Sequence, residues 1–137
     1  MSQEFIKGIE NGRASFAYEC ANSVNSELKK AYKSHVKSFP MMVKTNGLGS
    51  AIAFLFSKKD KEKHVYETVG THIVKWLIQD DKYKIYNLVK FTDLKGLVAN
   101  ITSLNSSQYR ALTIEVLSFF KWLRRFADGL YEGEDDE

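Results

Sequence analysis

Residues 109–131 read YRALTIEVLSFFKWLRRFADGLY, and this segment carries the clearest periodic pattern of the chain. Its apolar side chains recur at alternating steps of three and four residues, which is the spacing of one face of an α-helix. On a helical wheel this face covers an arc of about 100°. The segment therefore predicts an amphipathic helix that packs on a core through a stripe made of Tyr109, Leu112, Val116, Phe119, Leu123, Phe126 and Leu130.

The opposite side of this predicted helix is basic and carries two apolar residues. An arc of about 100° holds the cations Arg110, Lys121, Arg124 and Arg125. Ile114 and Leu117 lie among them, although a purely solvated face needs no large apolar side chain. Two interpretations stay open: neighbouring helices cover these two residues, or the face is a docking surface for RNA or for a protein subunit.

A stripe of mostly small residues indicates a helix in the N-terminal part of the chain. Steps of three and four residues connect its members, Ala14, Ala17, Ala21, Val24, Leu28 and Ala31. This spacing predicts one continuous helix face. If the helix continues that far, Lys30, Lys33 and Lys37 fall on the side opposite the stripe.

The single proline, Pro40, is expected to separate this helix from a second one that runs from Met41 to about Ser57. The residue before a proline disfavours helical geometry, whereas proline itself suits the first turn of a helix. The second helix carries small residues on one side, which would let a neighbouring helix pack closely. These residues are Gly47, Ser50 and Ala51.

The chain between residues 65 and 107 predicts two more helices and one ambiguous segment. The first helix carries four apolar residues in helical register, namely Val65, Val69, Ile73 and Trp76. Residues 80–91 alternate only partly with a period of two, which predicts a loop and a short helix, with a strand as the minority alternative. Thr92 and Asp93 are good caps for a helix over residues 94–101, and residues 105–107 are expected to cap the last helix.

Length and composition fit a small domain built from such helices. The chain has 137 residues, 44% of them hydrophobic, with one proline and eight glycines. So few breakers favour long uninterrupted elements. We therefore predict an all-α, compact, single-domain helix bundle of about five to six helices over residues 1–131.

Charge is unevenly distributed along the chain. The net charge is +3, but five of the 17 acids lie in residues 132–137, which leaves 20 basic against 12 acidic residues, or +8, over residues 1–131. A basic body of this kind favours a polyanionic partner. Residues 132–137 lack apolar side chains, so we expect them to form a disordered acidic tail.

Catalytic and metal-binding patterns are weak. His35, His64 and His72 offer no pair at metal-ligand spacing, and Cys20 is the single cysteine. His72 falls near the apolar stripe of its helix, where a buried, hydrogen-bonded histidine is the expected interpretation. The sequence thus predicts a protein that is not an enzyme and that needs no metal and no cofactor.

The sequence also predicts a cytoplasmic protein without membrane contact. No apolar segment approaches the roughly 20 residues needed to span a bilayer. The first residues, MSQEFIKGIENGR, lack the basic and apolar regions of a secretory signal. The lone Cys20 fits a reducing compartment.

Three blocks of sequence together resemble a known family. The first block is YK at 32–33 with FPMMV at 39–43, and the second is NGL at 46–48 with AIAFL at 51–55 and SKK at 57–59. The third is YRALTIEVL at 109–117 with WLRRFA at 122–127. In order and separation, over about residues 13–131, they resemble the small α-helical subunit of type III-B CRISPR effector complexes, the RNA-guided, RNA-targeting machines of the RAMP module.

The resemblance implies a subunit without catalytic activity that serves antiviral defence. Copies of such a subunit stack into a short filament inside the complex. They contact backbone RAMP subunits and the polymerase/cyclase-like large subunit, and they line the channel for guide RNA and target RNA. The alternative is a purely architectural, protein-binding subunit that makes no direct contact with RNA.

A subunit in that position needs a basic strip that follows phosphates without reading bases. The candidate RNA-binding residues are Lys30, Lys33, Lys37, Lys44, Arg110, Lys121, Arg124 and Arg125. Ile114 and Leu117 are the candidate residues of a subunit interface. The sequence gives Tyr109, Phe54 and Trp122 no special claim to base stacking.

Overall fold

The computed structural model describes residues 3–79 and 91–131, and within these ranges the chain is helical and contains no strand. The short 3-10 turns η1 (Ser26–Leu28) and η2 (Glu62–His64) precede α2 and α4. The predicted all-α bundle is confirmed by six α-helices, which are α1 (Gln3–Ser23), α2 (Lys29–Asn46), α3 (Leu48–Ser57), α4 (Val65–Leu77), α5 (Leu94–Ile101) and α6 (Ser106–Leu130). The predictions for residues 80–90 and for the acidic segment 132–137 lie outside the described residues.

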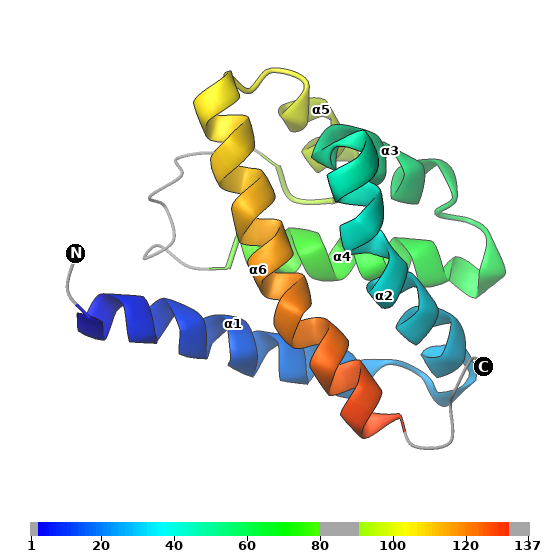
Figure 1. The fold of residues 1–137 in the computed structure, drawn as a ribbon. Coiled ribbons are helices and arrows are strands. Elements are labelled where there is room, and N and C mark those ends of the chain that lie inside the picture. Colours follow the sequence, from blue (N-terminus) through cyan, green and yellow to red (C-terminus); the bar gives the residue numbers. More distant parts are fainter. Residues whose placement is uncertain (1–2, 80–90, 132–137) are drawn as a thin grey trace.

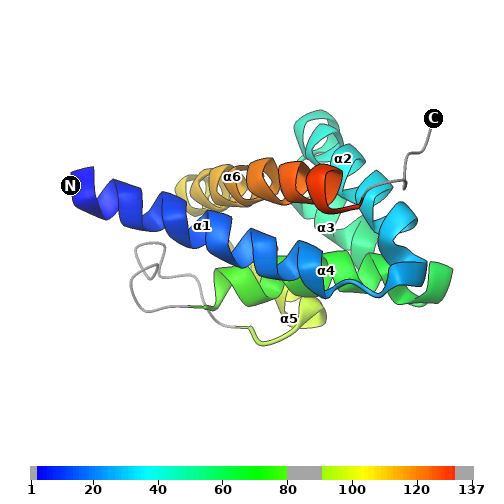
Figure 2. The same ribbon diagram turned by 90° about the horizontal axis from the view of Figure 1, so that it is seen from below.

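The longest helix, α6, runs across the molecule and packs most extensively on α1 and α2 (Figure 1). α2 lies beside α6 and runs in the opposite direction (Figure 1). From below, α1 is seen between α6 and α4 (Figure 2). α3 and α5 pack on each other and close the bundle at the end where α6 begins.

The predicted stripe of the last helix is confirmed as the side of α6 that faces the core. Leu112, Val116, Phe119 and Leu123 are each at most 2% exposed. At the N-terminus of α6, the Asn105 side chain accepts a hydrogen bond from the backbone of Gln108, whose side chain in turn accepts one from the backbone of Asn105. This reciprocal capping satisfies backbone donors that the first turn of a helix leaves without partners.

The predicted continuous N-terminal helix is wrong, because the chain turns between Ser23 and Lys29. Val24 and Leu28 in this turn are still buried, so the spacing of apolar residues continues although the helix does not. The backbone N–H of Leu28 donates to the carbonyl of Asn25 at 2.9 Å, which closes the short turn η1. Tertiary packing thus preserves a helical pattern across a bend, and the lysines of α2 take an orientation that the pattern does not predict.

The predicted helix boundary at Pro40 is also wrong, because Pro40 lies inside α2 and the helix ends at Asn46. The ring of Phe39 stacks on that of Phe120 of α6 at 4.8 Å, and Val43 is 4% exposed. This packing on both sides of Pro40 offsets the backbone hydrogen bond that proline removes. The break occurs instead at Gly47, which has a φ of 91°, a region that favours glycine.

The predicted close approach of neighbouring helices is confirmed at Gly47 and Ala51 and is wrong for Ser50. Ala51 is fully buried and Ser50 is exposed. A Cβ atom at Gly49 would lie 3.3 Å from Ile101 of α5, and the Gly49 backbone N–H donates to the hydroxyl of Tyr109 at 2.7 Å. The start of α3 is therefore held against both α5 and α6.

The predictions for α4 and α5 are confirmed. Val65, Val69, Ile73 and Trp76 are each at most 2% exposed. The side chain of Asp93 accepts a hydrogen bond from the backbone N–H of Gly96 at 2.8 Å, and so caps α5 as expected. None of the helices in the described ranges combines the length and the apolarity that a bilayer crossing requires.

Candidate functional site

A groove of about 690 Å³ lies between α2 and α6 and collects half of the predicted RNA-binding residues. The stacked rings of Phe39 and Phe120 hold the two helices together at its base. Four cations that are far apart in sequence line it, namely Lys44 of α2 and Lys121, Arg124 and Arg125 of α6. All four are exposed, and none pairs with an acid in residues 3–79 or 91–131. We call this the cationic groove.

Asp128 lines the cationic groove near the C-terminus of α6 and forms ion pairs with two lysines of α2. Its Oδ1 atom lies 3.8 Å from the ammonium of Lys33 and 3.8 Å from that of Lys37. Lys33 is only 4% exposed, so its predicted position on a solvent-facing side is wrong. The bend before α2 turns this lysine toward α6. Lys37 is half-buried, whereas Lys30 is exposed on α2 outside the groove.

The two apolar residues of the basic face differ in burial. Ile114 is 57% exposed, so no helix of the described chain covers it. Leu117 is half-buried, packs against the core and lines the cationic groove. Since the two are three residues apart on one helix, they lie on neighbouring turns of the same side. The interpretation that neighbouring helices cover these two residues is therefore partly right for Leu117 and wrong for Ile114.

Arg110 lies apart from the cationic groove. It lines a shallow hollow at the beginning of α6, together with Leu104, Tyr109 and Thr113. Eleven residues of helix separate it from Lys121, which corresponds to about 16 Å along the axis. The structure therefore joins Lys44 to the basic cluster of α6 and separates Arg110 from it.

Glu115 positions α6, a role that the sequence pattern does not predict. The residue is 3% exposed, and its carboxylate accepts hydrogen bonds from Nε and Nη2 of Arg13 at 2.7 and 2.9 Å. The indole N–H of Trp76 donates to the same group at 2.9 Å. Two parallel bonds from one guanidinium to one carboxylate fix both orientation and distance. Glu115 thus ties α1, α4 and α6 together behind the cationic groove.

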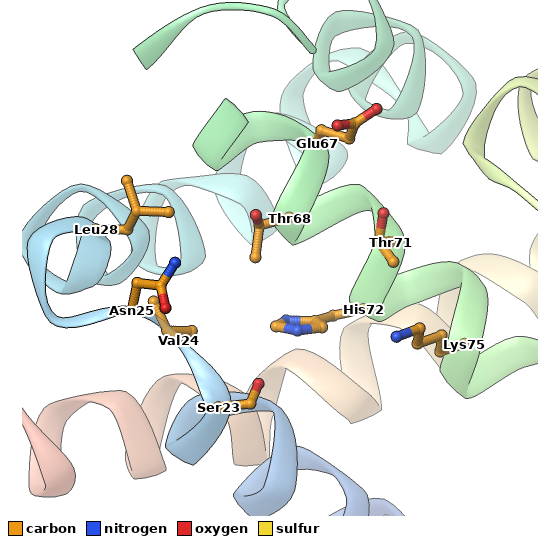
Figure 3. Close-up of a pocket in the computed structure, with 9 residues that line it drawn as sticks. All are labelled: Ser23, Val24, Asn25, Leu28, Glu67, Thr68, Thr71, His72 and Lys75. Atoms are coloured by element: carbon orange, nitrogen blue, oxygen red, sulfur yellow. The ribbon is translucent and has the colours of Figure 1, made fainter. Parts of the chain in front are cut away.

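A second hollow, of about 270 Å³, lies between the bend after α1 and the outer side of α4 (Figure 3). Polar side chains of Ser23, Asn25, Thr68 and Thr71 surround the ring of His72, which is 8% exposed (Figure 3). The Nδ1 atom of His72 lies 2.7 Å from the hydroxyl of Tyr32. The sequence prediction of a buried, hydrogen-bonded His72 is confirmed.

The His72 ring is uncharged in this second hollow, although Glu67 and Lys75 also line the hollow (Figure 3). Burial, with a smaller contribution from the nearby charge of Lys75, lowers the pKa of His72 to about 4, so its ring is uncharged at neutral pH. The Ser23 hydroxyl donates to the carbonyl of Cys20, and the Thr68 hydroxyl donates to that of His64. Both hydroxyls are thus engaged with backbone, and neither forms a nucleophile and base pair with His72.

Metal ligands do not gather in the part of the chain that the structure describes, where no group of three or more His, Cys, Asp or Glu residues could hold an ion. Cys20 is buried, and desolvation raises its thiol pKa to about 12, which makes a reactive thiolate unfavourable. The side chains that stand out are therefore the exposed cations of the groove and the apolar residues beside them.

Fold and groove define a class of small all-helical protein whose longest helix has one side in the core and a cationic side toward solvent. The family model of the CRISPR-associated protein (Cas_Cmr5) matches residues 9–130, and the chain belongs to this family. This confirms the family resemblance found in the three sequence blocks.

Comparisons with individual proteins agree with the family assignment. The chain is 28% identical to the CRISPR system Cmr subunit Cmr5 of Thermus thermophilus over 117 residues, which are 85% of this chain and 90% of that protein. It is also similar to the crystal structure of a CRISPR-associated Cmr5 family protein from Thermus thermophilus, with a TM-score of 0.71 and 26% identity. That similarity covers 90% of this chain and 98% of the other.

Proposed function

We propose that this protein is a non-catalytic small subunit of a type III-B CRISPR effector complex and that its cationic groove holds the backbone of guide or target RNA. The family match over residues 9–130 supports the assignment to a complex of this kind. The similar Thermus thermophilus protein is itself described as a Cmr subunit. A cytoplasmic location and a role in antiviral defence follow from that assignment.

The observation that carries the RNA role is the convergence of four cations without acidic partners among the described residues. Lys44 comes from α2, and Lys121, Arg124 and Arg125 come from about one and a half turns of α6. Binding of a phosphate backbone to such a group releases condensed counterions, which provides affinity that does not depend on base sequence. Backbone contacts of this type fix the position of a strand without reading it. This suits a subunit that must accept any guide.

The second part of the proposal is that Ile114 and the edge of Leu117 contact other subunits. Ile114 is 57% exposed, and Met41 of α2 is 65% exposed, so large apolar side chains face solvent on both helices that form the groove. Contact with another copy of the chain, with backbone RAMP subunits or with the polymerase/cyclase-like large subunit would remove this surface from water. Stacked copies would then place their grooves along one path.

Charge removal in the assembled complex tests the RNA role. A groove variant changes Lys44, Lys121, Arg124 and Arg125 to glutamine. A control variant changes four exposed lysines elsewhere, Lys58, Lys61, Lys75 and Lys95, to glutamine, so that both variants take the net charge from +3 to −1. We expect the groove variant to weaken target RNA binding by the complex at moderate salt and the control variant to leave it nearly unchanged. Equal effects of the two variants would exclude a specific role of the groove.

The alternative function is a purely architectural subunit without direct RNA contact, and the exposure of Ile114 favours it. Ile114→Asp should then block co-assembly with the other subunits, while the groove variant should assemble and bind target RNA normally. Because Ile114 is exposed, its replacement is expected to change the free energy of unfolding of the isolated chain by less than about 0.5 kcal/mol. Because both functions place Ile114 at a contact with other subunits, target RNA binding by assembled complexes that carry the groove variant is the measurement that separates them.

A further inference from the structure

Three aromatic side chains form a row on the surface where α1 crosses α6. The ring of Tyr18 meets that of Phe126 edge-on at 5.4 Å, with an interplanar angle of 83°. Phe126 in turn stacks on Trp122 at 5.9 Å and 24°. Tyr18 is 46% exposed, and Phe126 and Trp122 are both half-buried. The row therefore presents aromatic surface to solvent.

This aromatic row adjoins the cationic groove. Trp122 lines a hollow of about 280 Å³ together with Lys121 and Arg125. The same two cations also line the cationic groove. A chain that places phosphates against Lys121 and Arg125 from the groove would thus pass directly beside the indole of Trp122.

Packing of α1 on α6 accounts for only part of this arrangement. The aromatic residues of α6 that serve the core, Phe119 and Phe120, are fully buried. Trp122 is left half-buried, yet its orientation is fixed, because its indole N–H donates to Oε1 of Glu10 at 2.5 Å. A ring held in one orientation loses little conformational freedom when a flat ligand stacks on it.

From this geometry we infer that Trp122, supported by Phe126, is a stacking site for an unpaired nucleobase of the RNA strand whose phosphates occupy the cationic groove. The site accepts any base, because every base has a π-face and the hollow offers cations rather than a base-specific pattern of donors and acceptors. Proteins that bind single strands without sequence preference combine these two elements, a cationic track and aromatic side chains beside it. The inference rests on the proposed RNA role of the groove.

Tryptophan fluorescence of the full chain tests the stacking directly. The chain has two tryptophans, and Trp76 is 2% exposed, so a ligand at the surface acts on the emission of Trp122. The probes are a twelve-nucleotide oligouridylate and an abasic ribose-phosphate strand of the same length. We expect the oligouridylate to quench the emission, and the abasic strand to bind through its phosphates with little quenching.

Two substitutions at the same position isolate the contribution of the ring. Trp122→Phe and Trp122→Leu both remove the indole N–H that binds Glu10, but only Trp122→Phe keeps an aromatic face. At fixed salt we expect Trp122→Leu to weaken oligouridylate binding about tenfold and Trp122→Phe to weaken it much less. Affinity for the abasic strand should be the same in both variants, as measured with a labelled strand, and thermal melting should show that both remain folded.

The outcomes separate this inference from the function on which it rests. If oligouridylate and the abasic strand bound equally well, and Trp122→Leu changed neither, the stacking site would be wrong while the groove function would stand. If Trp122→Leu left RNA binding intact but abolished co-purification with other subunits, the row would be a protein contact and the inference would be overturned. If neither strand bound the chain or its assembled complex, the groove function would fall together with the stacking site.

Discussion

Nε of Arg13 lies 2.7 Å from Oε2 of Glu115, so an ion pair joins the first and the last helix across 102 residues of sequence. The pair is largely removed from solvent, with side-chain exposures of 14% and 4%. In such surroundings the attraction between the charges offsets the cost of removing them from water only when both partners are present. The position of α6, and with it the orientation of the cationic groove, therefore depends on both residues.

Removal of one partner of this pair should be strongly destabilising. We expect Glu115→Leu to lower the free energy of unfolding by about 3 kcal/mol, because Arg13 loses its most buried acid partner and Trp76 loses the Glu115 acceptor, while the ion pair of Arg13 with Glu10 remains. Glu115→Gln should lose less, since the amide oxygen still accepts from Trp76. Urea denaturation measures both, and a double-mutant cycle with Arg13→Met gives the coupling between the partners. A coupling near zero would show that the pair does not hold α1 on α6.

Stability should fall as the pH drops below about 6.5, because of His72. Burial lowers its pKa from 6.5 to about 4 in the folded state, so the unfolded chain binds a proton at higher pH than the folded chain does. The contribution of uncharged His72 to the free energy of unfolding is complete above pH 6.5 and is lost as the pH falls toward 4. Between pH 7 and pH 5 we expect the free energy of unfolding to fall by about 2 kcal/mol. His72→Asn, which does not titrate, serves as the control. Parallel pH profiles of the two proteins in urea denaturation would contradict the assignment.

Salt dependence should reveal the number of phosphates that the cationic groove binds. For single strands, the slope of log K against log salt concentration is about −0.7 for each phosphate neutralised. The groove variant with glutamine at Lys44, Lys121, Arg124 and Arg125 should therefore have a slope that is shallower by up to about 3. The control variant with four changed surface lysines should keep the original slope. Anisotropy titrations of a labelled oligonucleotide at several salt concentrations make this comparison.

Gly47 should tolerate alanine poorly, in contrast to Gly129. The φ of Gly47 is 91°, and a Cβ atom there would lie 3.2 Å from the hydroxyl of Tyr109. We expect Gly47→Ala to cost roughly 1–3 kcal/mol. Gly129 lies within α6, and a Cβ atom there would meet nothing within 4 Å, so Gly129→Ala should be neutral or stabilising by up to about 1 kcal/mol. Thermal melting of the two variants checks the contrast.

Local sequence patterns were sufficient to predict the helices that have a capping residue at their start and a regular apolar period. α6 has an unbroken apolar period and a capping box, and α5 has Asp93 at its start, so each helix is specified within its own segment. The bend between α1 and α2 escaped prediction because both of its sides bury apolar residues at helical spacing. The helix boundary predicted at Pro40 is wrong because the backbone hydrogen bond that proline removes is outweighed by the packing of Phe39 on Phe120. That packing joins residues far apart in sequence, so no local pattern indicates it.

The candidate site was predicted in its composition but not in its arrangement. The exposure of Lys121, Arg124 and Arg125 follows from the periodicity of α6 alone. That Lys44 joins them, whereas Arg110 does not, depends on the antiparallel contact of α2 with α6. The burial of Lys33 against Asp128 depends on the same contact. Glu115 lies beside the apolar stripe of α6, and an acid at such a position is the one sequence signal that could have indicated a buried ion pair.

The placement of Asp128 makes the cationic groove electrically asymmetric along its length. Lys33 and Lys37 share the Asp128 carboxylate at one end, so positive charge is partly cancelled there, while Lys44 and Lys121 remain uncompensated by any acid of the described residues. A polyanion that lies along the groove would therefore meet an acid at one end only. This difference between the ends gives the groove a polarity, and copies arranged head to tail would repeat it in the same sense.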